Sequence, residues 1–159
     1  MSSEVPFLVV DASVVVKWFV SEDEDGVAQA AALLAQHAEG QVRLVAPALI
    51  AHELMGVFVR RLRGPQVLEA LDAFFDAGVH LVAPDRELMA RAARLAQHCQ
   101  LSAFDSAYAA VADTLGCALV TADRRLANAL ADTVETRTTG CPYGTGYIKA
   151  RLGETARPL

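Results

Sequence analysis

Residues 7–13 read FLVVDAS, in which four apolar residues are followed by an aspartate and two small residues. A short apolar run that ends at a polar residue is typical of a strand buried in a sheet. Asp11 then stands at the carboxyl end of that strand. In open parallel sheets, ligands bind outside the carboxyl ends of the strands. The stretch therefore predicts a buried strand with a place for chemistry at its end.

Similar apolar runs recur along the chain, and helical patterns separate them. We predict strands at residues 7–10, 43–46, 79–82 and 117–120, and helices at residues 27–38, 49–62, 67–77, 87–98 and 104–115. Asp85 and Ser102 are suited to cap the starts of two of these helices, and Gly116 follows the end of another. Strands that alternate with helices indicate an α/β fold with a parallel sheet.

The composition suits one soluble domain. The 159 residues are 53% hydrophobic and 21% charged, which is enough for a covered core. The three cysteines show no ligand spacing and favour a reducing cytoplasm, and no apolar segment predicts association with a membrane. The net charge of −5 argues against a sequence-blind basic nucleic-acid binder. It does not exclude a nuclease whose metal ions supply positive charge.

The end of the chain differs from the rest. Residues 133–137 could form a polar edge strand. From Thr138 the sequence is rich in Gly and Thr and has no apolar period. We therefore predict one domain over residues 1–137 and an irregular C-terminal tail over residues 138–159.

Four acids fall where the pattern predicts burial or the end of a strand: Asp11, Glu53, Asp105 and Asp123. Removing an ionised carboxylate from water costs several kcal/mol or more unless a partner compensates it. The chain has no matching set of interior Lys or Arg. Hard cations such as Mg²⁺ and Mn²⁺ prefer oxygen ligands and often hold substrate phosphates as well. The four acids together predict a metal-dependent enzyme that acts on phosphate.

Each acid also has a purely structural alternative. Asp11 and Asp123 could cap the helices that follow them, because Asp is a preferred N-cap residue. Asp105 could belong to a capping box that starts at Ser102. Glu53 shares an apolar helix face, but it could instead reach water or pair with a neighbouring Arg60 or His52.

Two hydroxyl residues accompany the acids. Ser13 and Thr121 could hydrogen-bond a carboxylate or a metal-bound water, which metal sites usually require, or they could cap turns. The sequence contains no Walker loop and no GxGxxG motif for a nucleotide cofactor, and no GxSxG motif for a serine nucleophile.

Four stretches in this order and spacing, VVDASVVVKWF (9–19), LVAPALIAHEL (44–54), LSAFDSAYAAVA (101–112) and ALVTADRRLANAL (118–130), resemble the PIN-domain ribonucleases, and specifically the VapC toxins of prokaryotic toxin–antitoxin pairs. The resemblance covers roughly residues 7–131. It implies a single PIN-like domain with a parallel five-stranded sheet between helices, an α/β/α sandwich. It also implies a Mg²⁺- or Mn²⁺-dependent endoribonuclease that hydrolyses RNA phosphodiester bonds, a cognate VapB-like antitoxin and commonly a homodimer. The family's acidic quartet maps onto Asp11, Glu53, Asp105 and Asp123, and its small hydroxyl residues onto Ser13 and Thr121.

One residue departs from the family pattern, and two rival functions stay open. Gly56 replaces an asparagine common in the family, which removes an amide and costs on the order of 1 kcal/mol in a helix. One rival is a catalytically idle PIN-like module that binds other proteins. The other is a phosphatase of the haloacid-dehalogenase type, which also places an Asp after its first strand. That class requires a second Asp two residues later, where this chain has Ser13.

Overall fold

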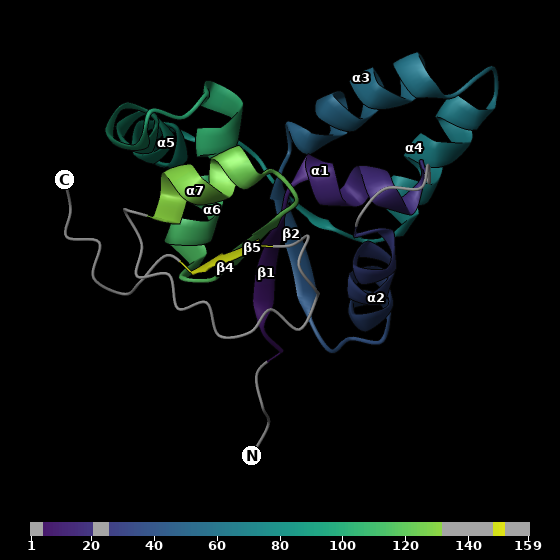
Figure 1. Cartoon of the computed structure of the whole chain (residues 1–159), viewed down its shortest axis with the longest axis horizontal. Helices are drawn as coiled ribbons and strands as arrows, with labels where there is room; N and C mark the ends of the chain where they lie inside the picture. The colour runs from purple at the N-terminus through teal and green to yellow at the C-terminus, as the bar shows by residue number, and fades with distance from the viewer. Residues whose placement is uncertain (1–4, 21–25, 132–147, 152–159) are drawn as a thin grey trace.

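The computed structural model describes residues 5–20, 26–131 and 148–151. In chain order the elements are β1 (Phe7–Val10), α1 (Ala12–Val15), the 3-10 turn η1 (Val16–Trp18), α2 (Val27–Ala38), β2 (Arg43–Pro47), α3 (Ile50–Arg61), α4 (Gln66–Asp76), β3 (His80–Val82), α5 (Arg86–Cys99), α6 (Ala103–Leu115), β4 (Ala118–Thr121), α7 (Arg124–Ala131) and β5 (Ile148–Arg151). Figure 1 shows a central sheet with α5 and α6 on one side and α1 and α2 on the other. The predicted α/β class is confirmed.

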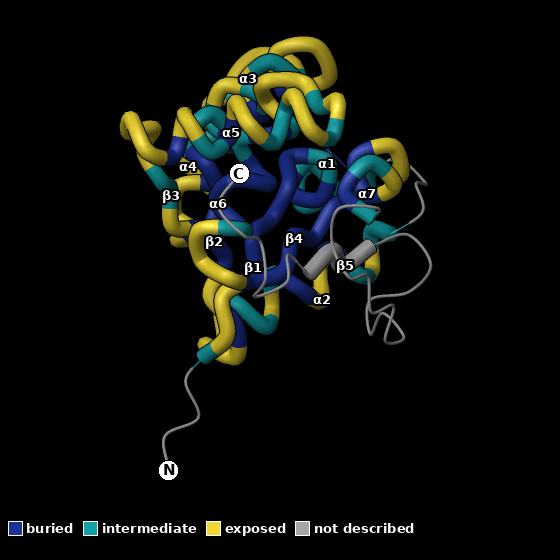
Figure 2. The backbone as a smooth tube through the Cα atoms, turned by 90° about the vertical axis from the view of Figure 1, so that its left-hand side faces the viewer, coloured by how far each residue is buried: buried dark blue, intermediate teal, exposed yellow. Residues whose placement is uncertain are grey.

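The sheet has the strand order β3-β2-β1-β4-β5, with β1 at its centre. Strands β1 to β4 are parallel to one another. Val9 of β1 is paired with Val45 of β2 and with Leu119 of β4, and all three side chains are buried. In Figure 2 the middle strands β1 and β4 are dark, which marks them as buried. A parallel sheet is typically covered by helices on both faces, which explains this burial.

The prediction of five parallel strands is wrong for the last strand. β5 pairs antiparallel with β4, so only four strands are parallel. An antiparallel neighbour needs no crossover that carries the chain back to the other end of the sheet. β5 also lies within the predicted irregular tail, and its sequence IKAR has no run of apolar residues that would announce a strand. The predicted edge strand at residues 133–137 lies outside the described residues.

The other predicted elements occur within one or two residues of their expected ends. Asp85 caps α5 by accepting from the Leu88 N–H at 2.7 Å. Ser102 caps α6 by accepting from the Asp105 N–H at 3.0 Å. Gly116 ends α6 in the left-handed conformation, at a φ of 59° that suits glycine.

None of the helices in the described part of the chain combines the length and the apolar character needed to cross a membrane.

The buried face of β4 predicts a large effect of truncation. Leu119→Ala removes a fully buried side chain, so the free energy of unfolding should fall by about 2–5 kcal/mol. The matched control is Leu68→Ala on α4, where the side chain is 66% exposed and the change should stay within about 0.5 kcal/mol. Urea unfolding measures both. Equal effects of the two substitutions would contradict the burial of β4.

Candidate active site

The carboxyl ends of β1 and β4 bring Asp11 and Thr121 together. The strands are parallel neighbours, and the Asp11 N–H donates to the Val120 carbonyl oxygen at 3.0 Å. Both side chains are buried, with 7% of Asp11 and 1% of Thr121 exposed. Neighbouring parallel strands end at the same edge of a sheet, so residues 110 positions apart in sequence meet there.

Two hydroxyl groups converge on one oxygen of Asp11. Ser13 donates to Oδ2 at 2.6 Å, and Thr121 donates to the same atom at 2.8 Å. The hydroxyls in turn accept from the backbone, Ser13 from the Ala122 N–H and Thr121 from the Asp123 N–H, each at 3.0 Å. The loop after β4 is thereby fixed against the start of α1, with the Asp11 carboxylate between them.

Asp11 does not use its side chain as a helix cap. It is the N-cap residue of α1 in an extended conformation, but its carboxylate makes no capping hydrogen bond. Burial raises the pKa of Asp11, the bonds from Ser13 and Thr121 partly offset this rise, and the charge of Asp105 raises the pKa further. The group is therefore a buried acid that is held in place but lacks a compensating cation in the described structure.

Glu53 has a partner that the sequence did not reveal. Its carboxylate accepts a hydrogen bond from the hydroxyl of Tyr108, a residue of α6 with no exposed surface. The alternative pairing of Glu53 with Arg60 or His52 is not seen. Burial raises the pKa of Glu53, the Tyr108 bond lowers it, and the charges of Asp11 and Asp105 raise it.

Tyr108 could have been found from its position. It lies three residues after Asp105 and so shares its helix face. The apolar period made it look like a core residue only. A buried tyrosine normally finds a partner for its hydroxyl, and the only question is which one. Its own pKa is raised, first by burial and then by the charge of Glu53, so Tyr108 stays a donor.

Asp105 and Asp123 lie at the starts of two helices. The backbone of Asp105 is capped by Ser102, while Asp123 caps α7 itself: its Oδ1 accepts from Arg125 N–H at 2.8 Å and from Leu126 N–H at 3.3 Å. The capping alternative therefore holds for one oxygen of Asp123. The Oδ2 atoms of Asp105 and Asp123 both lie 3.9 Å from Nη2 of Arg125, whose side chain is 83% exposed.

The described carboxylates influence one another without enclosing a metal position. Asp105 acts on the pKa values of both Asp11 and Glu53. Nevertheless, in the part of the chain that the structure describes, no three His, Cys, Asp or Glu side chains converge as metal ligands do. Instead, Asp11 accepts from two hydroxyls, Glu53 accepts from Tyr108, and Oδ2 of each of the other two lies 3.9 Å from Arg125. The donor set is nevertheless oxygen throughout, which suits a hard divalent cation.

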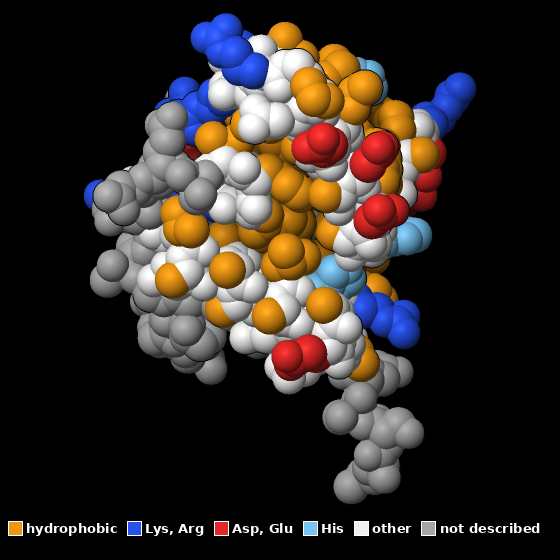
Figure 3. Space-filling model, turned by 90° about the vertical axis from the view of Figure 1, so that its right-hand side faces the viewer, with side chains coloured by type: hydrophobic (Ala, Val, Ile, Leu, Met, Phe, Trp, Pro, Cys, Tyr) orange, Lys and Arg blue, Asp and Glu red, His pale blue; other side chains and the backbone are white. Residues whose placement is uncertain are grey.

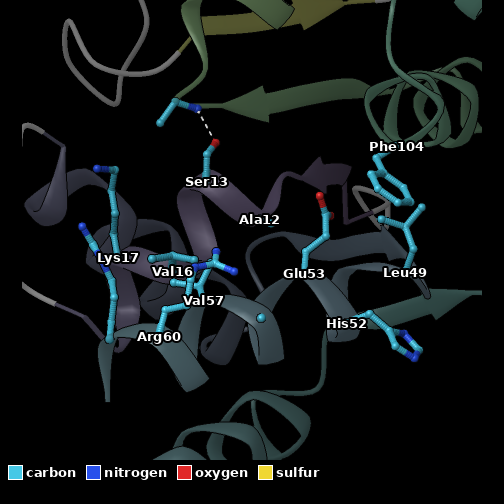
Figure 4. Close-up of a pocket in the computed structure, with 13 residues that line it drawn as sticks. Ala12, Ser13, Val16, Lys17, Leu49, His52, Glu53, Val57, Arg60 and Phe104 are labelled. Atoms are coloured by element: carbon cyan, nitrogen blue, oxygen red, sulfur yellow. Dashed lines mark hydrogen bonds between the residues drawn. The ribbon is translucent and has the colours of Figure 1, made fainter. Parts of the chain in front are cut away.

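A groove of about 1040 Å³ opens beside these acids, lined mainly by α1, η1 and α3. Figure 4 shows Glu53 pointing into it, with Ser13 at its edge bonded to the loop after β4. His52 lines the groove too, on the far side of α3 from Ser13 in this view. The acid Glu53 is therefore accessible from a groove that could admit a large molecule.

Comparison with known proteins agrees with this geometry. The family model of the PIN domain matches residues 8–130, and the chain belongs to the PIN domain family. No curated protein matches the chain. Among solved structures, it is similar to the crystal structure of Mycobacterium tuberculosis VapC20, a sarcin-ricin loop cleaving toxin. The TM-score is 0.53 at 18% identity, over 67% of this chain and 82% of that one, which is a likeness of fold.

The bond between Tyr108 and Glu53 predicts a shift in one titration. Tyr108→Phe removes a donor that lowers the pKa of Glu53, so that pKa should rise. The fold should lose about 1–3 kcal/mol, the value of a hydrogen bond to a charged group. Carbon-13 NMR of the Glu53 carboxyl and urea unfolding provide the measurements. Thr114→Val, an exposed position on the same helix, is the control and should leave the Glu53 resonance in place.

The raised pKa values of Asp11 and Glu53 also predict how stability depends on pH. Their ordinary values are 3.8 and 4.5. The folded chain holds protons above those values that the unfolded chain has released, so stability is lost as pH rises above them. In chelator, urea unfolding should show this loss in the natural sequence and a smaller one in Asp11→Asn, Glu53→Gln. Parallel pH profiles would contradict the shifts.

Proposed function

We propose that this chain is a VapC-like endoribonuclease that uses Mg²⁺ or Mn²⁺ to hydrolyse RNA phosphodiester bonds. The observation that supports it most is the buried Asp11, held through one oxygen by Ser13 and Thr121 at the strand ends of a PIN fold. Glu53 stands near it with a raised pKa of its own. Buried acids without a cation are costly, and a divalent ion would relieve that cost.

The residues proposed to hold the ion are Asp11, Glu53, Asp105 and Asp123. When bound, such an ion lowers the pKa of a water molecule and neutralises charge on phosphoryl oxygens. Asp11 is prepared for this because the hydroxyls occupy Oδ2 and fix the plane of the carboxylate. Tyr108 fixes Glu53 in the same way through one oxygen.

Asp105 and Asp123 are not held by hydroxyl donors as Asp11 and Glu53 are. Asp123 uses Oδ1 to cap α7, which leaves Oδ2 to face Asp105 across Arg125. The Arg125 side chain is mostly exposed, and an ion pair at 3.9 Å to an exposed cation is weak. A divalent ion can therefore displace this arginine at little cost.

The proposal includes partners and a location. The four motifs that resemble VapC toxins support a cognate VapB-like antitoxin that blocks the groove, a homodimer and a place in the cytoplasm. The RNA would be single-stranded or looped, because an acidic protein gains little from gripping the backbone of a duplex.

One observation favours the idle binding module instead. Arg125 lies between two of the acids, where a cation would otherwise be needed. The phosphatase has no such support: Ser13 fills the position of its second Asp and is bonded to Asp11.

The purified chain should cleave single-stranded RNA only when Mg²⁺ or Mn²⁺ is added, and it should leave 5′-phosphate and 3′-hydroxyl ends because water is the attacking group. Asp105→Asn should abolish cleavage while Tm stays unchanged or rises, since crowded like charges are relieved. The matched control is Asp76→Asn, an exposed acid on α4, which should cleave normally. Cleavage in excess chelator, or 2′,3′-cyclic phosphate products, would contradict metal-dependent hydrolysis by water. Full activity of Asp105→Asn would show that Asp105 is not a metal ligand and serves only at the start of α6.

A further inference from the structure

The groove beside Glu53 has two chemically different ends. Lys17 and Arg60 lie on one side of Glu53, and Phe104 and Leu49 lie on the other (Figure 4). The first end carries positive charge and the second presents an apolar surface. The acid therefore stands between a cationic wall and an aromatic one.

Phe104 is an unusual residue at the aromatic end. Its side chain is 60% exposed although it lines a groove, and it immediately precedes Asp105 in α6. Within the described ranges, the ring pairs join other aromatic residues, so no second ring covers Phe104. Exposed apolar surface inside a groove is typical of a binding site.

Arg60 is one of the cations at this end of the groove, and it lies close to Gly56. A Cβ on Gly56 would stand 3.5 Å from Nη1 of Arg60, so the guanidinium folds back over the glycine, one turn along α3. Glu53, Gly56 and Arg60 all line the groove. A Cβ at position 56 would meet Arg60 only at ordinary van der Waals distance, so Arg60 and Glu53 can share this side of α3.

The charge of the groove is opposite to that of the chain. The whole sequence carries a net charge of −5, whereas the groove is lined by three Lys or Arg residues and one acid, Glu53. On the face shown in Figure 3, Lys and Arg side chains lie at the margins and acidic ones nearer the middle. Cations concentrated in a groove of an acidic protein indicate a ligand that carries phosphate.

We propose that the groove binds a single RNA strand, with a backbone phosphate against Arg60 and an unstacked base on the ring of Phe104. The inference rests on the proposed ribonuclease function and deepens it by giving the strand two contacts on either side of Glu53. Along the groove, Arg60, Glu53 and Phe104 follow one another in space. This order of cation, acid and aromatic ring matches the alternation of phosphate and base in an RNA strand. Bases that are not paired can stack on aromatic side chains, whereas those of a duplex cannot.

The test measures binding apart from cleavage. A short fluorescein-labelled single-stranded RNA of mixed sequence is titrated with the full chain in chelator, and fluorescence anisotropy gives Kd at several salt concentrations. The variants are Phe104→Ala, Phe104→Trp and Arg60→Gln. Phe75→Ala and Arg94→Gln are matched controls: Phe75 is 57% exposed, Arg94 is exposed, and neither lines the groove. A duplex of the same sequence is titrated in parallel.

Phe104→Ala should raise Kd for the single strand by at least about fivefold, the effect of losing one stacked base, and should leave the salt dependence unchanged. Phe104→Trp should bind like the natural sequence. Arg60→Gln should reduce the slope of log Kd against log salt by about 0.7, the value of one phosphate contact on a single strand. The Phe104→Ala effect should be absent with the duplex.

Three results would overturn the proposal: no binding by the natural sequence, a Kd for Phe104→Ala equal to that of Phe75→Ala, or an unchanged slope for Arg60→Gln. If the natural sequence cleaves RNA with Mn²⁺ while the variants bind like the controls, only these two contacts fail. If it binds RNA but never cleaves it, the ribonuclease function fails while the contacts stand.

Discussion

The structure depends on a carboxylate buried where three elements meet. Asp11 lies at the end of β1, beside the end of β4 and at the start of α1, and one of its oxygens receives both nearby hydroxyls. Without those donors, a buried charge at this position would be strongly destabilising. The same two bonds fix the loop after β4, which carries Asp123. The hydroxyls of Ser13 and Thr121 therefore stabilise Asp11 and also fix the end of β4 against α1.

A second hydrogen bond links α6 to α3 in the same way. Tyr108 reaches from the interior of α6 to Glu53 on α3, so a hydrogen bond to this acid joins two helices in addition to apolar contact. Both partners have raised pKa values, because burial disfavours the charged form of each. The protein thus keeps its acids ordered by hydroxyl donors, which orient a carboxylate but do not neutralise it. The negative charge remains available for a cation.

Asp105 and Asp123 lie beside a cation, Arg125, rather than beside hydroxyl donors. The Arg125 side chain is 83% exposed in the first turn of α7, and its Nη2 lies 3.9 Å from each of the two acids that hydroxyl groups do not hold. A weak exposed ion pair stabilises little. Asp105 is nevertheless close enough to Asp11 and Glu53 for its charge to raise both of their pKa values. The four acids therefore form two pairs. Hydroxyl donors hold Asp11 and Glu53, whereas Asp105 and Asp123 lie beside the exposed Arg125.

Local pattern in the sequence determined the class of fold, the four parallel strands, the helix caps at Asp85 and Ser102, and the approximate place of the acids. These features follow from periodicity and from backbone groups that need a partner nearby in sequence. Tertiary structure alone decided that β5 runs antiparallel, that Tyr108 bonds Glu53, and that Arg60 and an exposed Phe104 lie at opposite ends of one groove. Each of these depends on which distant groups meet when the sheet and helices pack. A one-dimensional pattern records burial and spacing, but not the partner.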